Sequence, residues 1–224
     1  SDFNIFHNEK ILVRVDNENK IINFDMIDSS GRAIIKSNKI KNWNFKLNTL
    51  NKSFNYDDLD YYNMQPNSCV TFLNSSFDMI SLSSNNIECP STFQFVNSSG
   101  TINDVKINNS KYDAFHAEFS NLKIMNIEVN YVGQECIVVK TGNYEITNAK
   151  MSNCLDKAIS SGELAVLSIN KVDIANSHFG LVAKDSSKII AENVSISMSD
   201  LCLFAYRSKY EYQSSIINTQ KKKY

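Results

Sequence analysis

Residues 111–132 read KYDAFHAEFSNLKIMNIEVNYV, and residues 133–154 read GQECIVVKTGNYEITNAKMSNC. When the two stretches are written one above the other, apolar residues stand over apolar residues at matching positions. The pattern extends over residues 89–220 with a period of 22. Its blocks begin at Cys89, Lys111, Gly133, Leu155, His178 and Asp200, and the Leu155 block carries one extra residue. A repeat of this length is typical of a solenoid, in which each unit buries its apolar side only against its neighbours.

Three columns of apolar residues run through the stacked blocks. The first contains Phe93, Phe115, Ile137, Ile159, Val182 and Phe204. The second contains Val105, Ile127, Ala149, Val172 and Val194, and the third contains Ile107, Val129, Met151, Ile174 and Ile196. Alternation with polar residues and a scarcity of helix formers indicate short strands joined by turns. Because parallel crossovers are almost always right-handed, the sequence predicts an all-β fold, a single-stranded right-handed parallel β-helix with 22 residues per rung.

The 224 residues are predicted to form one β-helix domain over residues 1–224. Residues 1–9 are expected to cap the first rung, because an open rung exposes unpaired backbone groups. Residues 10–47 are predicted to form two shorter rungs, since the stretches KIINFDM (20–26) and KIKNWNF (39–45) match at a spacing of 19.

Residues 48–66 interrupt the pattern and are rich in Asn, Asp and Tyr, which indicates an inserted loop. Regular rungs are expected over residues 67–213. They are followed by a tail over residues 214–224, which ends near three lysines and is expected to be solvated.

Composition excludes some classes of partner. The formal net charge is −1, so no overall positive field indicates nucleic-acid binding. No run of eighteen apolar residues predicts a membrane span. Neither a cofactor nor a metal site is predicted, because the three histidines are not spaced as ligand pairs and no aspartate cluster is evident.

The five cysteines are an odd set without CxxC spacing: Cys69, Cys89, Cys136, Cys154 and Cys202. A disulfide framework is therefore not expected, and reduced, partly buried thiols are predicted instead. A column of polar residues, Asp104, Asn126, Asn148 and Asn193, is predicted to stack at a corner, where asparagine amides hydrogen-bond along the ladder and tolerate a left-handed backbone.

Two charged columns are the candidate functional site. Asp113, Glu135 and Lys157 form one, at the corner before the strand, and Glu118 and Lys140 begin the other. The second column is predicted to continue through Glu163, Asp185 and Arg207, with His116, Lys184 and Tyr206 between the two columns. Stacked carboxylates raise one another's pKa, and with a cation and a histidine they can serve as general acid, general base and charge stabiliser.

The predicted roles divide into two groups. The predicted catalytic residues are Asp113, His116, Glu118, Glu135 and Lys157. The predicted substrate-binding residues are Lys140, Glu163, Lys184, Asp185, Tyr206 and Arg207. The alternative is that these charges form an ordinary solvated face, because alternating charges neutralise one another along a ladder and surface ion pairs are common.

Several local stretches carry a resemblance to a known family. Residues 156–163 (DKAISSGE), 179–187 (FGLVAKDSS) and 202–206 (CLFAY) are similar to those of bacterial right-handed parallel β-helix proteins of the pectate-lyase-like superfamily. The resemblance covers residues 67–213 and implies a function at surface polysaccharides or the cell envelope. Family members tend to carry two strand aspartates where this chain has His116 and Val138, which leaves room for a changed substrate or a non-catalytic copy.

Three functions are compatible with these features. The first is a carbohydrate-active enzyme on a bacterial or acidic polysaccharide, by lyase, hydrolase or epimerase chemistry. The second is a non-catalytic polysaccharide-binding or scaffolding module of a larger protein or complex. The third is a surface fibre, for which a long exposed apolar stripe is lacking in the sequence. The resemblance implies a place in the bacterial cytoplasm or cell envelope and does not choose between them.

Overall fold

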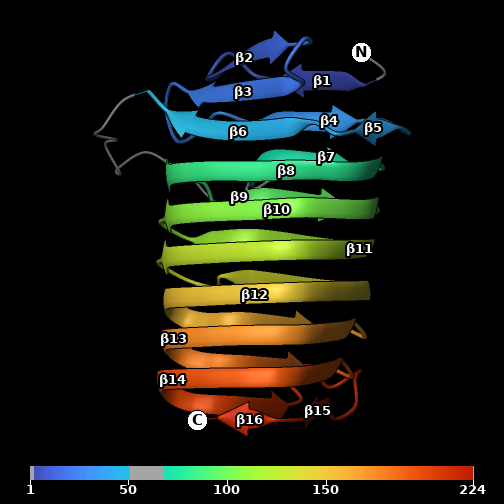
Figure 1. The fold of residues 1–224 in the computed structure, drawn as a ribbon, viewed down its shortest axis with the longest axis vertical. Coiled ribbons are helices and arrows are strands. Elements are labelled where there is room, and N and C mark those ends of the chain that lie inside the picture. Colours follow the sequence, from blue (N-terminus) through green and yellow to red (C-terminus); the bar gives the residue numbers. More distant parts are fainter. Residues whose placement is uncertain (1–2, 51–67, 224) are drawn as a thin grey trace.

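The structure is a computed structural model that describes residues 3–50 and 68–223. Sixteen strands and no helix are present among these residues, and they form one sheet that winds into a right-handed β-solenoid of about eight turns (Figure 1). The coils stack in parallel about 22 residues apart. The predicted all-β solenoid is therefore confirmed.

The strands follow one another along the chain without intervening helices. They are β1 (Asn4–His7), β2 (Ile11–Asp16), β3 (Ile21–Met26), β4 (Ala33–Lys36), β5 (Ile40–Lys41), β6 (Asn44–Thr49), β7 (Ser68–Leu73), β8 (Ser76–Ile87), β9 (Ser91–Val96), β10 (Ser99–Ser110), β11 (Asp113–Val132), β12 (Ile137–Gly162), β13 (Val166–Lys184), β14 (Lys188–Tyr206), β15 (Ile216–Thr219) and β16 (Lys222–Lys223).

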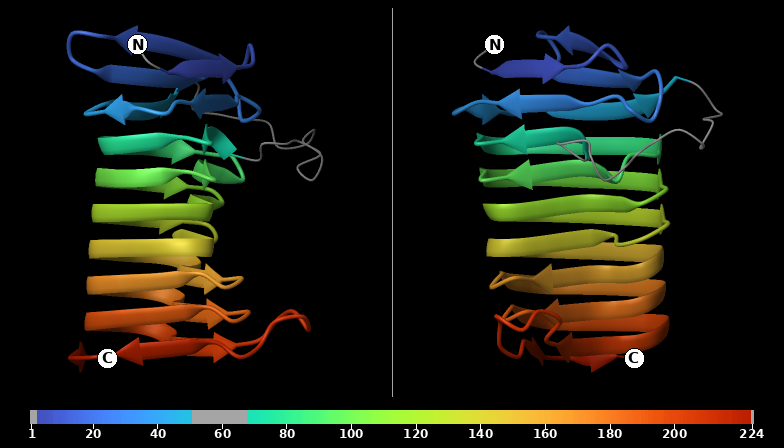
Figure 2. Two further views of the ribbon diagram at one scale, coloured as in Figure 1. Left: turned by 90° about the vertical axis from the view of Figure 1, so that its right-hand side faces the viewer. Right: turned by 180° about the vertical axis from the view of Figure 1, so that it is seen from behind.

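From β7 onward each coil has two faces. The short face comprises residues 68–73, 91–96, 113–118, 137–140, 157–162, 179–184 and 201–206. The long face comprises residues 76–87, 99–110, 121–132, 143–154, 166–177 and 188–199. Figure 1 views the long face, and the right-hand view of Figure 2 shows the short face from behind.

The predicted long-face columns are confirmed residue by residue. Val105 pairs with Ile127 and Ile107 with Val129, and both columns continue to Val194 and Ile196. All ten side chains are buried. Towards the N-terminal end the core is aromatic, with stacked, edge-on or tilted ring pairs among Phe24, Phe45, Phe72, Phe95 and Phe115.

The predicted short-face column is correct down to Ile159 and wrong beyond it. Ile159 pairs with Leu181, and Leu181 with Leu203, so Val182 and Phe204 are each one residue out of register. Between β12 and β13 the pairing distance is 22 residues on the short face, where Lys157 pairs with Phe179, and 23 on the long face, where Asn143 pairs with Val166. The extra residue therefore lies at the corner that follows Gly162, and not at the start of the Leu155 block.

The first coils differ from the prediction in register. Ile21 pairs with Asn44 and Phe24 with Leu47, which is a spacing of 23 residues and not 19. The N-terminal cap is also longer than residues 1–9, because β1 pairs antiparallel with β4 and β2 pairs antiparallel with β3. Two antiparallel strands thus cover both open edges of the first coil.

At the other end, the predicted tail contributes two strands. β15 and β16 pair in parallel with β14 and cover the long face of the last coil. Lys222 and Lys223 are therefore in a strand, although their side chains are exposed. Most of the predicted loop over residues 48–66 lies outside the described residues, and its first two residues belong to β6.

One corner of the solenoid has a left-handed backbone in every coil from β8 to β14, and we call it the asparagine corner. It consists of Asn86, Asn109, Tyr131, Asn153, Asn176 and Met198. The predicted column of Asp104, Asn126, Asn148 and Asn193 exists, with Lys171 in the fourth coil, but it lies within long-face strands at negative φ. The left-handed asparagines are thus a different column from the one predicted.

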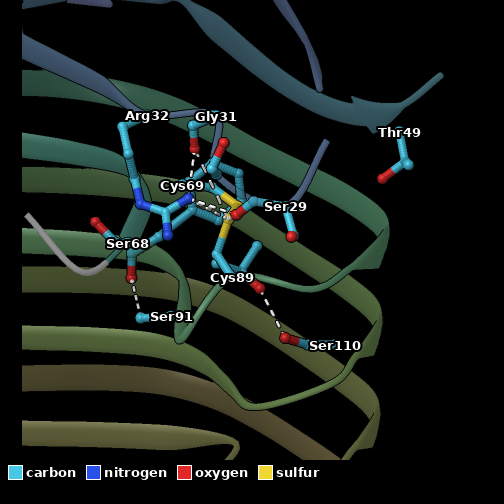
Figure 3. Close-up of a disulfide and its surroundings, with 12 residues drawn as sticks. Ser29, Gly31, Arg32, Thr49, Ser68, Cys69, Cys89, Ser91 and Ser110 are labelled. Atoms are coloured by element: carbon cyan, nitrogen blue, oxygen red, sulfur yellow. Dashed lines mark hydrogen bonds between the residues drawn. A yellow bond between two sulfur atoms is a disulfide. The ribbon is translucent and has the colours of Figure 1, made fainter. Parts of the chain in front are cut away.

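The prediction of reduced thiols is wrong for four of the five cysteines, because disulfides join Cys69 to Cys89 and Cys136 to Cys154, and it is correct for Cys202, which is free. The partners are 20 and 18 residues apart, nearly one coil, so the winding brings their Cα atoms to 5.6 and 5.8 Å. The guanidinium of Arg32 lies beside the first disulfide, with Nη1 3.3 Å from Sγ of Cys89 (Figure 3). Disulfides persist mainly in oxidising compartments.

Candidate functional site on the short face

Charged residues stack at one border of the short face, as their spacing of 22 residues predicts. The backbone N–H of Glu135 donates to Oδ1 of Asp113 at 3.1 Å. Nζ of Lys157 lies 2.8 Å from Oε1 of Glu135 and also contacts the carboxylate of Asp156. We call these four residues the acidic edge. The side chains of Glu135 and Lys157 are only 15% and 14% exposed, so they are recessed and not freely solvated.

The acidic edge holds one carboxyl group that keeps its proton in weak acid. Burial and the nearby Glu135 carboxylate raise the pKa of Asp113 to about 6. The pKa of Lys157 is also raised: burial lowers it, but the hydrogen bonds to Asp156 and Glu135 raise it by more. Near neutral pH the edge therefore combines a protonatable carboxyl group with an ion pair.

A column of mostly buried side chains lies next to the acidic edge. His116 pairs with Val138, and further down the same outward column Ser160 pairs with Val182. Nε2 of His116 and Oγ of Ser160 are buried, and neither has a hydrogen-bond partner among the described residues. Burial, with the charge of Lys140, lowers the pKa of His116 to about 4, so its imidazole is neutral at pH 7. We call these four residues the floor.

A second charged border lies on the other side of the floor, and we call it the lysine edge. Glu118 pairs with Lys140, and Nζ of Lys140 is 3.7 Å from Oε1 of Glu163. Nζ of Lys209 contacts the same Glu163 oxygen at 2.8 Å. Burial raises the pKa of Glu163, but the hydrogen bond from Lys209 and the charge of Lys140 lower it by more. The charge of Lys140 also reaches Asp113, so the two edges are electrostatically connected across the floor.

The continuation of this column differs from the prediction by one residue. Ser161 pairs with Ala183 and Lys184 pairs with Tyr206, so Lys184 and Tyr206 belong to the lysine edge and do not lie between the two columns. The Lys184 side chain passes close to Gly162, whose missing Cβ would lie 3.3 Å from Lys184 Cε.

Asp185 and Arg207 lie beyond the strands, and the predicted substrate-binding role of Asp185 does not fit its surroundings. Asp185 is 1% exposed and accepts hydrogen bonds from the backbone N–H groups of Ser208 and Lys209. Burial raises its pKa, but these N–H groups lower it by more. Its carboxylate therefore holds the turn after β14, and Arg207 is exposed beside that turn.

The sequence reasoning missed an aromatic cluster on the same face. The rings of Phe179 and Phe204 stack at 5.6 Å, and those of Phe204 and Tyr206 stack at 4.7 Å. Nζ of Lys157 lies 5.9 Å from the Phe179 ring. Burial raises the pKa of Tyr206, and the charges of Lys157 and Glu135 also act on it. The one-residue register error had placed Phe204 in the core, so this cluster was not recognisable from the sequence.

No group of three or more metal-ligating side chains occurs among the residues that the structure describes. Within the same part of the chain, no helix is long and apolar enough to cross a membrane. No protein family, curated protein or solved structure matches the chain. The class that can be stated is therefore that of the fold, a parallel β-solenoid, and the resemblance to pectate-lyase-like proteins stays a prediction.

Proposed function

We propose that the protein hydrolyses an acidic polysaccharide on its short face. The observation that carries this proposal is the stacking of Asp113 against Glu135, in which one carboxyl group is protonated near pH 6 and the other is ion-paired with Lys157. Two carboxyl groups with different protonation states are what glycosidic-bond hydrolysis requires.

The two carboxyl groups take different roles. Asp113 donates its proton to the glycosidic oxygen, while the Glu135 carboxylate attacks the anomeric carbon. Water then attacks the same carbon, its proton passes to the Asp113 carboxylate, and the bond from the sugar to Glu135 breaks. The bond from the anomeric carbon to the glycosidic oxygen breaks, and the proton from Asp113 completes the leaving hydroxyl. Coils stack about 4.8 Å apart, near the separation of about 5 Å used by glycosidases that retain anomeric configuration. Nζ of Lys157 contacts the Glu135 carboxylate at 2.8 Å and holds it in place.

The other side of the site supports an acidic and extended substrate. The lysine edge carries more cations than anions. The three cations are Lys140, Lys184 and Lys209, and the two anions are Glu118 and Glu163. A carboxylate on the polymer can contact these lysines while its glycosidic bond lies over the floor. The repeating, nearly flat short face suits a chain of sugars better than a compact metabolite.

The test is incubation of the protein with acidic polysaccharides, followed by measurement of both reducing ends and ultraviolet absorbance. Reducing ends without absorbance, with retained anomeric configuration in the first product, support hydrolysis through Glu135. Unsaturated products indicate lyase chemistry and contradict it. Asp113→Asn and Glu135→Gln should each lower kcat at least about a hundredfold. The matched control is Glu128→Gln, because Glu128 also pairs with a lysine (Lys150, 3.0 Å) but lies on the long face.

A second candidate, a non-catalytic polysaccharide-binding module, is favoured by the aromatic cluster. Phe179, Phe204 and Tyr206 form a nearly parallel stack whose rings differ by 16° and 20°, and Phe204 is 37% exposed. Such rings bind the apolar faces of sugars. Binding on a glycan array without product formation, lost in Phe204→Ala but kept in Asp113→Asn, would identify this function in place of hydrolysis.

A further inference from the structure

One hollow on the described surface lies at the asparagine corner and adjoins the acidic edge. It has a volume of about 570 Å³. Its lining includes Asn109, Lys111, Tyr131, Gly133, Asn153 and Leu155. Lys111, Gly133 and Leu155 precede Asp113, Glu135 and Lys157 by two residues in the same coils, so the hollow and the acidic edge are neighbours.

Two large side chains stand in solvent at this hollow. Tyr131 is 58% exposed and Leu155 is 73% exposed. Between them Gly133 presents no side chain, and it must remain glycine because a Cβ there would lie 2.0 Å from the Lys111 carbonyl oxygen. The hollow is therefore bordered by the Tyr131 ring on one side and the Leu155 side chain on the other, with exposed backbone at Gly133 between them.

Amide groups complete the lining, and their ladder is broken at Tyr131. Along the asparagine corner two amide Nδ2 groups donate to the Oδ1 of the preceding coil, from Asn109 to Asn86 and from Asn176 to Asn153. Tyr131 stands where the next asparagine would follow Asn109. Asn153 donates sideways to Oδ1 of Asn130. Because Tyr131 replaces the asparagine of the next coil, no asparagine amide there donates to Oδ1 of Asn109. This oxygen is therefore available as an acceptor beside Tyr131.

Tyrosine at position 131 is also unfavourable for the stability of the backbone. Its φ is +54°, in the left-handed region that asparagine tolerates and bulky side chains avoid. Asparagine would restore the ladder and relieve the backbone.

We propose that this hollow is a binding subsite for a neutral sugar ring. The apolar face of the ring stacks on Tyr131 against Leu155, and its hydroxyls hydrogen-bond to the amides of Asn109 and Asn153. This proposal rests on the proposed polysaccharide hydrolysis and extends it. It assigns an uncharged sugar to the position next to the cleaved bond, outside the acidic edge, while the acidic sugar contacts the lysine edge.

The test is isothermal titration calorimetry with neutral hexasaccharides (cellohexaose, maltohexaose and N-acetylated chitohexaose) against the wild type, Tyr131→Asn and Phe119→Asn. Phe119 is the matched control, since it is 59% exposed, has φ +51° and interrupts the Asn74–Asn97 ladder at the opposite corner. We expect one hexasaccharide to bind the wild type and Phe119→Asn equally and to bind Tyr131→Asn at least about tenfold more weakly. The thermal midpoint of Tyr131→Asn should be at or above that of the wild type.

Two outcomes overturn the subsite. One is that none of the three hexasaccharides binds the wild type. The other is that Tyr131→Asn binds as tightly as Phe119→Asn. Failure of the hydrolysis proposal is distinguishable, because it would abolish product formation from acidic polysaccharide without changing these binding measurements.

Discussion

Asp113→Asn should stabilise the folded protein at neutral and alkaline pH and should not do so in acid. The pKa of Asp113 is raised from 3.8 to about 6 by burial and by the Glu135 carboxylate. A group with a raised folded-state pKa contributes stability below its unfolded pKa, and that stability is lost as pH rises through the folded pKa. The wild type should therefore lose stability between about pH 4 and pH 6.

The expected size follows from the shift. A difference of about two pKa units corresponds to about 3 kcal/mol of folding free energy above pH 6. Asparagine carries no charge at any pH, so the variant avoids this cost. It weakens the hydrogen bond from the Glu135 N–H, which costs about 1 kcal/mol. The net gain at pH 8 is thus about 2 kcal/mol, and at pH 4 the variant should be slightly less stable than the wild type.

The assay is urea unfolding at a series of pH values, followed by far-ultraviolet circular dichroism with both disulfides oxidised. Asp173→Asn is the control, because Asp173 is an exposed carboxylate on the long face. Parallel pH profiles for the wild type and Asp113→Asn would refute the reasoning. So would a carboxyl carbon titration by NMR that places Asp113 near pH 4.

The floor, the acidic edge and one glycine corner give three further predictions. Because the pKa of His116 is lowered to about 4, the free energy of unfolding should fall by about 3 kcal/mol as the pH falls from about 6.5 to 4. NMR should show a neutral imidazole at pH 6. Lys157→Met should cost about 2 kcal/mol in urea unfolding because it leaves the recessed Glu135 carboxylate unpaired, and a loss below about 0.5 kcal/mol would contradict this. Gly142→Ala should lower stability by at least about 3 kcal/mol, since its Cβ would lie 2.0 Å from the Ser120 oxygen at φ +145°, whereas Gly162→Ala should be tolerated.

The acidic edge was predictable because no extra residue is inserted into the 22-residue repeat between Asp113 and Lys157. Asp113, Glu135 and Lys157 are each 22 residues apart, and the observed short-face pairing distance is also 22. The lysine edge was only partly predictable. One extra residue can be accommodated at any corner, and each choice shifts the following strand by one position and exchanges its two faces. The sequence does not indicate which corner accepts it, so the predicted column continued through Asp185 and Arg207, and Lys184 and Tyr206 were predicted to lie between the two columns.

The sequence by itself determined that the chain coils, how long the coils after Cys89 are and which long-face residues fill their core, because a repeated apolar spacing can be buried only by stacking. The tertiary structure alone decided the corner that accepts the extra residue, the antiparallel caps, the left-handed asparagine corner and the two disulfides. These features depend on how the backbone turns between strands and on contacts between residues nearly one coil apart. Such contacts leave no periodic mark in the order of the amino acids.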